Sequence, residues 1–332
     1  MTANGKPKFA MYWAAACGGC EIAVLNIHEK ILDVDANFDV VFWPVAMDAK
    51  YKDVEAMEDG SILLTLFNGG IRNDENEHMA RLLRAKSKLL VAFGSCANEG
   101  CIPGLANLRA ADSIVQTAFH TLTTDNPSGI RPVTTFDAAE GKLHIPRLLP
   151  ALKTLADVVD VDYFMPGCPP ESHQVAAVID LVVQVLQGKA DLPPKGSVIG
   201  AGNSTVCDEC ERQRNVKSIQ SFGRIWATHT DPSLCLLEQG IACNGPATRS
   251  GCNARCPTAG AQCIGCYGPA EGVSDYGARL ISAFASVIDA KDPAEIDRIL
   301  DGLPDPTGQF YRFNLAGSLL HAGRPAWQKE PA

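Results

Sequence analysis

The sequence is poor in several features that define common protein classes. Positive charge does not predominate, and the net charge of −9 at pH 7 argues against nucleic acid or an anionic membrane surface as a partner. No apolar run approaches the length that spans a membrane. A Walker A loop, a GxGxxG motif after a strand and an HExxH motif are missing, and the seven histidines lack metal-ligand spacing. We therefore find no resident catalytic residues.

The N-terminus carries only a superficial likeness to an export signal. Lys6 and Lys8 precede the apolar stretch Phe9–Ala16, and Ala14–Cys17 looks like a lipoprotein cleavage site. That stretch is at the short limit for a signal peptide, and no twin-arginine pair precedes it. We expect a cytoplasmic protein, in which thiols stay reduced and clustered cysteines usually indicate metal binding or catalysis.

Cysteine is the residue that the sequence concentrates. Eight of the thirteen cysteines lie between residues 207 and 266, as two CxxC pairs that bracket four single cysteines. They are Cys207, Cys210, Cys235, Cys243, Cys252, Cys256, Cys263 and Cys266. Eight thiolates divide into two sets of four, and four is the complement of one tetrahedral zinc or one [4Fe–4S] cluster. Disulfides are a third interpretation, but a chain of this length does not need them.

Strand and helix patterns alternate through the first half of the chain. The expected strands are Phe9–Trp13, Phe38–Ala46, Ser61–Phe67, Lys88–Phe93 and Val158–Met165. The expected helices are Glu21–Val34, Asn73–Ala85 and Glu171–Gln187. This alternation predicts an α/β fold, with a flavodoxin-like, doubly wound parallel sheet.

A second domain follows a break rich in proline and glycine at Gly188–Gly196. We place the sheet domain at residues 1–190 and the second domain at 191–332, mostly irregular and helical because periodicity nearly vanishes around the cysteines. Helices are expected at Tyr276–Val287 and Pro293–Leu300, the latter with Asp292 as its N-cap. The tail Gln309–Leu320 is too apolar for a free end, so we expect it to pack on this domain or on a partner.

Four further cysteines stand just after predicted strands, namely Cys17, Cys20, Cys96 and Cys168. Doubly wound sheets build their sites at the carboxyl ends of strands, so these residues should converge in one crevice. Three sets of four cysteines favour an electron-transfer chain over three structural zincs, and we interpret all three as iron–sulfur sites.

Cys101 is the thirteenth cysteine and stands five residues after Cys96. It could replace Cys96 as a ligand or serve redox chemistry. A small buried apolar side chain is the simplest interpretation.

The motifs together resemble the small, electron-transferring subunit of cytoplasmic [NiFe] hydrogenases, over nearly the whole chain. Within these, the sequence looks most like the small subunit of F420-non-reducing (methyl-viologen-reducing) hydrogenase. The resemblance rests on Cys17–Glu21, Gly70–Asn76, Gly94–Ala97, Ile102–Leu105, Pro166–Pro170, Cys207–Cys210, Cys235–Gly240, Gly245–Arg249 and Cys263–Cys266.

This resemblance implies three sets of [4Fe–4S] ligands, whose names we keep below. They are a proximal set (Cys17, Cys20, Cys96 and Cys168), a medial set (Cys252, Cys256, Cys263 and Cys266) and a distal set (Cys207, Cys210, Cys235 and Cys243). Cys207 departs from many periplasmic relatives, which have histidine there. Cys101 stands where relatives usually have glycine, and Asn68 where many carry glutamate.

The resemblance also implies a function and partners. The chain would pass electrons between a nickel–iron site on a large subunit and an external acceptor, through three [4Fe–4S] clusters. The acceptor would be an iron–sulfur or flavin subunit, with a possible link to heterodisulfide reductase. Two alternatives remain: the cluster-bearing subunit of a respiratory NADH-dehydrogenase-like complex, and a redox- or hydrogen-sensing iron–sulfur protein.

Overall fold

The first half of the chain folds around a six-stranded sheet. In the computed structural model, which describes residues 5–215 and 218–320, the strand order is β10-β9-β5-β3-β1-β2, and every pairing is parallel. The strands are β1 (Lys8–Trp13), β2 (Asp39–Phe42), β3 (Ile62–Asn68), β5 (Ser87–Phe93), β9 (Tyr163–Met165) and β10 (Ser197–Val198). This confirms the predicted α/β fold with a doubly wound sheet.

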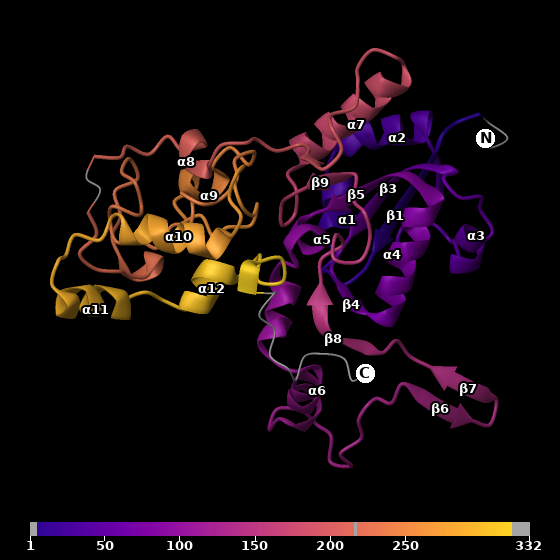
Figure 1. Cartoon of the computed structure of the whole chain (residues 1–332), viewed down its shortest axis with the longest axis horizontal. Helices are drawn as coiled ribbons and strands as arrows, with labels where there is room; N and C mark the ends of the chain where they lie inside the picture. The colour runs from indigo at the N-terminus through magenta and orange to yellow at the C-terminus, as the bar shows by residue number, and fades with distance from the viewer. Residues whose placement is uncertain (1–4, 216–217, 321–332) are drawn as a thin grey trace.

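Helices cover both faces of the sheet (Figure 1). They are α1 (Gly19–Leu25), η1 (His28–Lys30), α2 (Ile31–Asn37), α3 (Tyr51–Glu55), α4 (Asp74–Lys86), α5 (Ser95–Glu99) and α7 (Ser172–Leu186). Alternate residues of β1 enter opposite cores: Met11 packs with Val24 and Val175 of α1 and α7, whereas Tyr12 packs with the α4 side. The strands are apolar on both faces because each face is buried under helices.

Three expected elements are shorter than the sequence pattern indicates. The helix expected over Glu21–Val34 is broken: α1 ends at Leu25, and His28, whose φ of 56° is left-handed, lies between α1 and α2. Strand β2 stops at Phe42, two residues before Pro44, which has no N–H to donate. The strand expected from Val158 begins only at Tyr163, since the N–H of Val158 instead closes a turn onto the Leu155 carbonyl.

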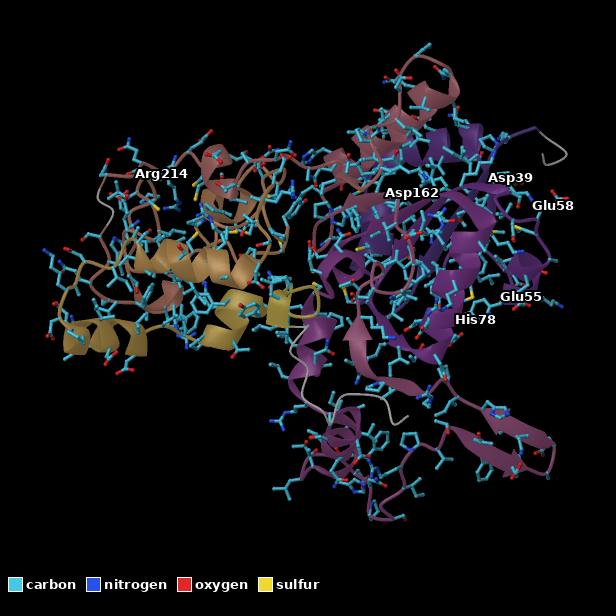
Figure 2. The ribbon with its side chains drawn as sticks, in the orientation of Figure 1. Asp39, Glu55, Glu58, His78, Asp162 and Arg214 are labelled. Atoms are coloured by element: carbon cyan, nitrogen blue, oxygen red, sulfur yellow. The ribbon has the colours of Figure 1, made fainter. Side chains whose placement is uncertain are left out.

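Asp162 fixes the start of β9 (Figure 2). Its buried carboxylate accepts hydrogen bonds from Arg84 Nη1 at 2.6 Å and from the N–H of Leu90 at 2.8 Å. It also pairs with Lys195 at 2.5 Å, just before β10. Strand β10 (Ser197–Val198) lies after residue 190, so the sheet includes one strand from the segment that follows the expected domain boundary. The boundary of the two domains stays a prediction, and their outermost residues lie outside the described chain.

An arm projects from the sheet domain between α5 and β9 (Figure 1). It consists of η2 (Ile102–Leu108), α6 (Ala111–His120), the hairpin β6 (Thr135–Ala138) and β7 (Gly141–His144), and β8 (Leu148–Lys153). Strand β8 returns to pair antiparallel with β4 (Ile71–Asn73). The side chain of Asn107 joins the two ends of the arm, since it bonds both the N–H and the carbonyl of Leu152.

The second half is mostly loops held around its cysteines. Its elements are α8 (Val206–Glu209), η3 (Ile225–Ala227), α9 (Arg255–Thr258), α10 (Tyr276–Ala285), α11 (Pro293–Asp301) and α12 (Pro306–Tyr311). The predicted cap is confirmed: Asp292 accepts from the N–H of Glu295 at 3.2 Å. The tail packs on its own domain as expected, with the rings of Phe284 and Phe310 5.9 Å apart. Among the described residues, no helix has the length and apolarity to span a membrane.

The tail continues onto the sheet domain. Phe313 is buried against Cys96 and Cys101, and the N–H of Gly317 donates to the Glu99 carbonyl at 3.1 Å. From the other side, the hydroxyl of Ser95 donates to the Cys266 carbonyl at 2.5 Å. The two halves therefore meet at α5, the helix that carries Cys96.

Candidate iron–sulfur sites

The structure brings the four proximal cysteines together at the carboxyl ends of the strands. Cys17 follows β1 and is exposed, whereas Cys20 on α1 and Cys96 on α5 are buried, and Cys168 after β9 is half-buried. Burial raises the pKa of the Cys20 thiol far above its usual range, and the neighbouring thiols of Cys96, Cys168 and Cys17 raise this pKa further. The topology predicted this convergence, because parallel strands end at one edge.

Glycine lets the backbone approach these sulfurs. Gly94, between β5 and α5, has a φ of 82°, and a Cβ added there would lie 2.3 Å from Cys20 Sγ. Only glycine suits such a conformation without strain. Gly167 is positioned by Ser95, whose Oγ accepts from the N–H of Gly167 at 3.1 Å.

Cys101 belongs to the same neighbourhood. It is fully buried and packs with Cys96, Cys168 and Phe313. Hydrogen bonds with Cys168 and Cys96, together with burial, raise the pKa of Cys101. The bond from Cys101 lowers the pKa of Cys168 to about 7, against the opposing effect of burial.

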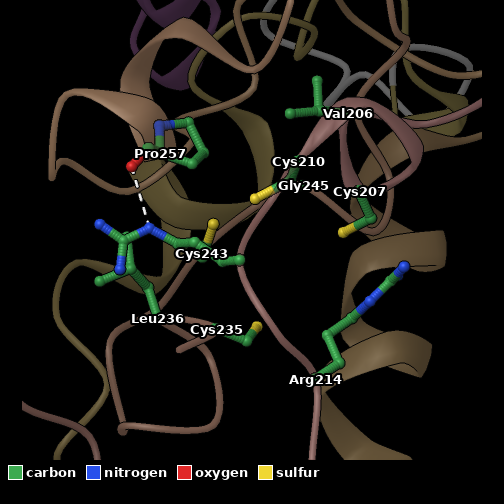
Figure 3. Close-up of a pocket in the computed structure, with 10 residues that line it drawn as sticks. Val206, Cys207, Cys210, Arg214, Cys235, Leu236, Cys243, Gly245 and Pro257 are labelled. Atoms are coloured by element: carbon green, nitrogen blue, oxygen red, sulfur yellow. Dashed lines mark hydrogen bonds between the residues drawn. The ribbon is translucent and has the colours of Figure 1, made fainter. Parts of the chain in front are cut away.

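The distal cysteines line one cavity in the second half (Figure 3). Cys207, Cys210, Cys235 and Cys243 reach it from three separate segments, and Gly245 gives it room, since a Cβ there would lie 2.9 Å from Cys207 Sγ. Burial raises the pKa of Cys207 to about 12, and the thiols of Cys243 and Cys235 add to this effect.

Arg212 holds the walls of this cavity in place. Its Nε donates to the Pro257 carbonyl at 2.9 Å, and its Nη1 donates to the carbonyls of Asp231 and Leu234, each at 3.0 Å. One guanidinium thus ties α9 to the loop that carries Cys235.

The medial cysteines lie between the other two sets. Burial raises the pKa of Cys266 to about 12, and the nearby thiols of Cys168, Cys252 and Cys256 raise this pKa further. Cys263 is buried against the distal set, with its N–H donating to Cys243 Sγ at 3.3 Å. Cys266 therefore faces the proximal set, and Cys263 faces the distal set.

The donor chemistry of the three sets fits iron–sulfur clusters. Each set offers four thiols, the number that one cluster requires. Gly94 and Gly245 have no side chain that would crowd the sulfurs of the proximal and distal sets. Over residues 5–215 and 218–320, no three His, Cys, Asp or Glu side chains meet closely enough to chelate a single ion.

Several supporting residues were missed by sequence reasoning. Tyr267 joins the two halves, since its hydroxyl accepts from the N–H of Glu171 at 2.9 Å and donates to Gln174. Its position directly after Cys266 was the only available signal. Glu21, directly after Cys20, is buried, which raises its pKa, while the hydrogen bond from Trp43 opposes this rise and Asn68 lies close to the same carboxylate. Asn68 thus lies beside the proximal set.

Comparison with known proteins first identifies a class. Residues 17–182 match the family model described as NADH ubiquinone oxidoreductase, 20 Kd subunit. The fold is shared with a solved [NiFeSe] hydrogenase of Desulfovibrio vulgaris Hildenborough, at a TM-score of 0.51 and 18% identity over 81% of this chain and 96% of that one. The family match places the chain in a class of oxidoreductase subunits, and its fold is the one that this solved hydrogenase chain has.

Two curated relatives make the identification more specific. The chain is 38% identical to the iron–sulfur subunit of the F420-non-reducing hydrogenase of Archaeoglobus profundus, over 95% of this chain and 98% of the relative. It is 35% identical to the corresponding F420-non-reducing hydrogenase subunit of Methanothermobacter marburgensis, over 95% and 96% of the two chains. The chain belongs to the family of [NiFe] hydrogenase small subunits, the electron-transfer components of oxidoreductases that act on H2.

Proposed function

We propose that this chain is an electron relay that holds three [4Fe–4S] clusters in its proximal, medial and distal sets. The observation that carries the proposal is the spatial order of the cysteines. Cys266 of the medial set lies beside Cys168, and Cys263 lies beside Cys243. Bound clusters would each accept and release one electron at a time.

The residues between the sets would hold the relay together. Ser95 links the proximal helix α5 to the medial backbone through its bond to the Cys266 carbonyl. The N–H of Cys263 donates to the distal sulfur of Cys243, and a hydrogen bond to a ligand sulfur tunes a cluster's potential. Phe313 is buried in one apolar cluster with Cys96, against which Cys266 packs, and this cluster would keep water away from the junction of the proximal and medial sets.

The partner at the proximal end would be a large subunit with a nickel–iron site. Cys17 is exposed, and the apolar side chains nearby are exposed as well: Trp13 by 41%, Ile22 by 55% and Leu25 by 52%. A covering subunit would bury this apolar rim and shield the proximal set.

The electron acceptor would dock at the distal end. A cavity of about 540 Å³ opens beside Cys207, Cys235 and Cys243, with Arg214 and Arg279 in its wall. The acceptor would be a cytoplasmic iron–sulfur or flavin subunit with a link to heterodisulfide reductase. These partner assignments go beyond the names of the relatives, which say only that those proteins are subunits of F420-non-reducing hydrogenases.

A respiratory role is the second candidate, because the matching family model describes a subunit of NADH ubiquinone oxidoreductase. That match ends at residue 182, before the eight cysteines of the medial and distal sets. A relay of three sets is better explained by the hydrogenase role.

The test is to reconstitute the isolated chain and assay H2-dependent dye reduction, with and without the large subunit. We expect activity only in the complex, and its loss in Cys17→Ala while nickel content persists. Activity of the isolated chain would refute a relay role. A native complex without nickel would favour the respiratory or sensing alternatives.

A further inference from the structure

The arm between η2 and β8 carries a large share of the exposed apolar side chains. Nine of the 22 large apolar side chains that are exposed over residues 5–215 and 218–320 lie between positions 102 and 148. The hairpin of β6 and β7 stands clear of both halves of the molecule at the end of this arm (Figure 1). Exposed apolar area that is concentrated on one segment indicates a surface that another protein covers.

The hairpin has one apolar face and one polar face. Phe136 lies directly opposite Leu143 in the ladder, and the N–H of Ile145 continues the pairing one residue beyond β7. Alternate residues of a strand share a face, so these three side chains lie together, and they are 59%, 57% and 50% exposed. The opposite face carries the next pair in the ladder, Asp137 and Lys142, which form an ion pair at 3.7 Å.

The apolar face of the hairpin has no cover in the described part of the chain. There, β6 and β7 pair only with each other, as a sheet of two strands. A two-stranded hairpin on its own is at best marginally stable in water, and packing of its apolar face stabilises it. The geometry of the hairpin therefore suits a strand pair that is completed by a partner protein.

The root of the arm is fixed beside the proximal set. At one end, η2 begins directly after Cys101, which packs with Cys96. At the other end, β8 pairs with β4, and Gly70, just before β4, exchanges two backbone hydrogen bonds of 3.1 Å with Ala15. Ala15 precedes Cys17 by two residues. A protein that covers Cys17 would therefore be led along β4 and β8 to the hairpin.

We propose that the hairpin of β6 and β7 is a clasp for the large subunit, which would receive the face of Phe136, Leu143 and Ile145 in an apolar groove. The inference rests on the proposed function, which places the large subunit over Cys17 and its exposed apolar rim. Continuity between that rim and the root of the arm assigns the face to the large subunit instead of a second copy of this chain. The electron acceptor is a poorer candidate, because the hairpin and the second half, which holds the distal cavity, lie toward opposite ends of the molecule (Figure 1).

The experiment measures the affinity of the large subunit for variants of the full chain, prepared anaerobically. The double variant Phe136→Ser, Leu143→Ser removes the apolar face. The double variant Asp137→Ser, Lys142→Ser is the matched control, because it changes the neighbouring pair of the same two strands on the opposite face. Iron content of each free variant checks that the rest of the chain is intact. Hydrogen exchange of the hairpin amides, in the free chain and in the complex, is a second measurement.

We expect the double variant of the apolar face to keep its iron and to bind the large subunit about a hundredfold more weakly, as for the loss of central apolar contacts at an interface. The control should change the affinity less than about threefold, because an exposed ion pair contributes little. In the wild type, the hairpin amides should exchange at least about tenfold more slowly in the complex than in the free chain.

Four results would overturn the inference. Unchanged affinity in Phe136→Ser, Leu143→Ser would exclude the clasp and leave the proposed function intact. Equal weakening in the control would attribute the effect to stability of the hairpin, and not to its apolar face. Self-association of the free wild-type chain that the same variant abolishes would assign the face to a second copy. A wild-type chain that binds no large subunit would overturn the proposed function, and this inference with it.

Discussion

The absence of a Cβ at certain glycines leaves space for the cysteine thiols that must share a site. At Gly94, Gly245 and Gly265 an added Cβ would come within 3 Å of another side chain, and at the first two that atom is a cysteine sulfur. Interiors this dense cannot absorb a methyl group without moving something else. Glycine at positions 94 and 245 therefore leaves room for the neighbouring cysteine sulfur, beyond any effect on backbone freedom.

Gly94→Ala should disrupt the proximal set specifically. The new Cβ would stand 2.3 Å from Cys20 Sγ and force the thiol away from its partners. We expect iron to fall by about four atoms per chain, the content of one cube. Gly188→Ala is the matched control, because Gly188 also has a positive φ, 69°, but has nothing within 4 Å of an added Cβ. Equal iron loss in both variants would attribute the effect to backbone strain.

At the residue scale, the sequence predicted that Cys17, Cys20, Cys96 and Cys168 converge and that Cys101 is buried, but it did not predict that Cys101 packs against Cys96 and Cys168. Cys17, Cys20, Cys96 and Cys168 follow strands, and strand ends are set by local patterns that can be recognised. The contact of Cys101 with Cys96 and Cys168 depends on a tight turn at Gly100 and on packing from the distant tail. No local pattern carries that information.

The loops of the second half depend on side-chain bonds where regular elements would use backbone ladders. Arg212 binds carbonyls from α9 and from the loop before Cys235. Arg249 does the same, with Nε on the Pro269 carbonyl at 3.0 Å and Nη1 on the Gly202 carbonyl at 2.8 Å. These bonds replace the missing helices and strands as the supports of the cysteines.

Arg212→Met should loosen the distal cavity. Leaving a buried carbonyl without its hydrogen-bond donor destabilises the fold by about 1–3 kcal/mol, so the melting temperature should fall. On heating, the EPR signal of the distal cluster should be lost before those of the other clusters. Arg224→Met is the control, since Arg224 is exposed and only covers the ring of Trp226 at 5.4 Å. It should change stability by less than about 0.5 kcal/mol. Similar losses in both variants would contradict a specific role for Arg212.

Prediction of elements from sequence worked where periodicity was long. Helix α7 and strand β5 each lie within one residue of their expected ends, because their apolar patterns match their burial. The arm from α6 to β7 was not predicted: its side chains are largely exposed, so it lacks a strong pattern. Helix Glu21–Val34 was wrong in length because the left-handed His28 leaves no trace in hydrophobic periodicity.

At the scale of the whole molecule, the contact between the halves contains a buried acid. Glu99 lies at the end of α5, and a Cβ at Gly268 of the second half would lie 2.5 Å from its Oε1. Burial raises the pKa of Glu99 to about 8, and Arg249 opposes this rise. Its Oε2 is buried without a hydrogen-bond partner in the described part of the chain.

Stability should therefore fall as the pH rises from about 4.5 to about 8. In this window the folded protein keeps a proton on Glu99 that the unfolded chain has released. One proton gives a slope of at most about 1.4 kcal/mol per pH unit. Thermal unfolding of Glu99→Gln across the window should show a flatter pH dependence than the wild type. Parallel curves for the two proteins would rule out this role of Glu99.

The complete relay should contain about twelve iron and twelve sulfide per chain, on four of each per cube. Metal and sulfide analysis of anaerobically prepared protein would measure both. Stoichiometric zinc with little iron would contradict the iron–sulfur interpretation. Eight iron would remove one cluster from the relay and would direct attention first to the medial or distal set.

The path of the chain through its three sets has a consequence for biogenesis. The sequence completes the proximal set at Cys168 and the distal set at Cys243, and only then supplies the medial set, Cys252–Cys266, which contacts both. Because synthesis proceeds from the N-terminus, the central link emerges from the ribosome last, when both of its neighbours are already available. If the three sets hold the proposed clusters, a chain that stops before Cys252 would lack the medial cluster, and electrons could not pass between the proximal and distal clusters.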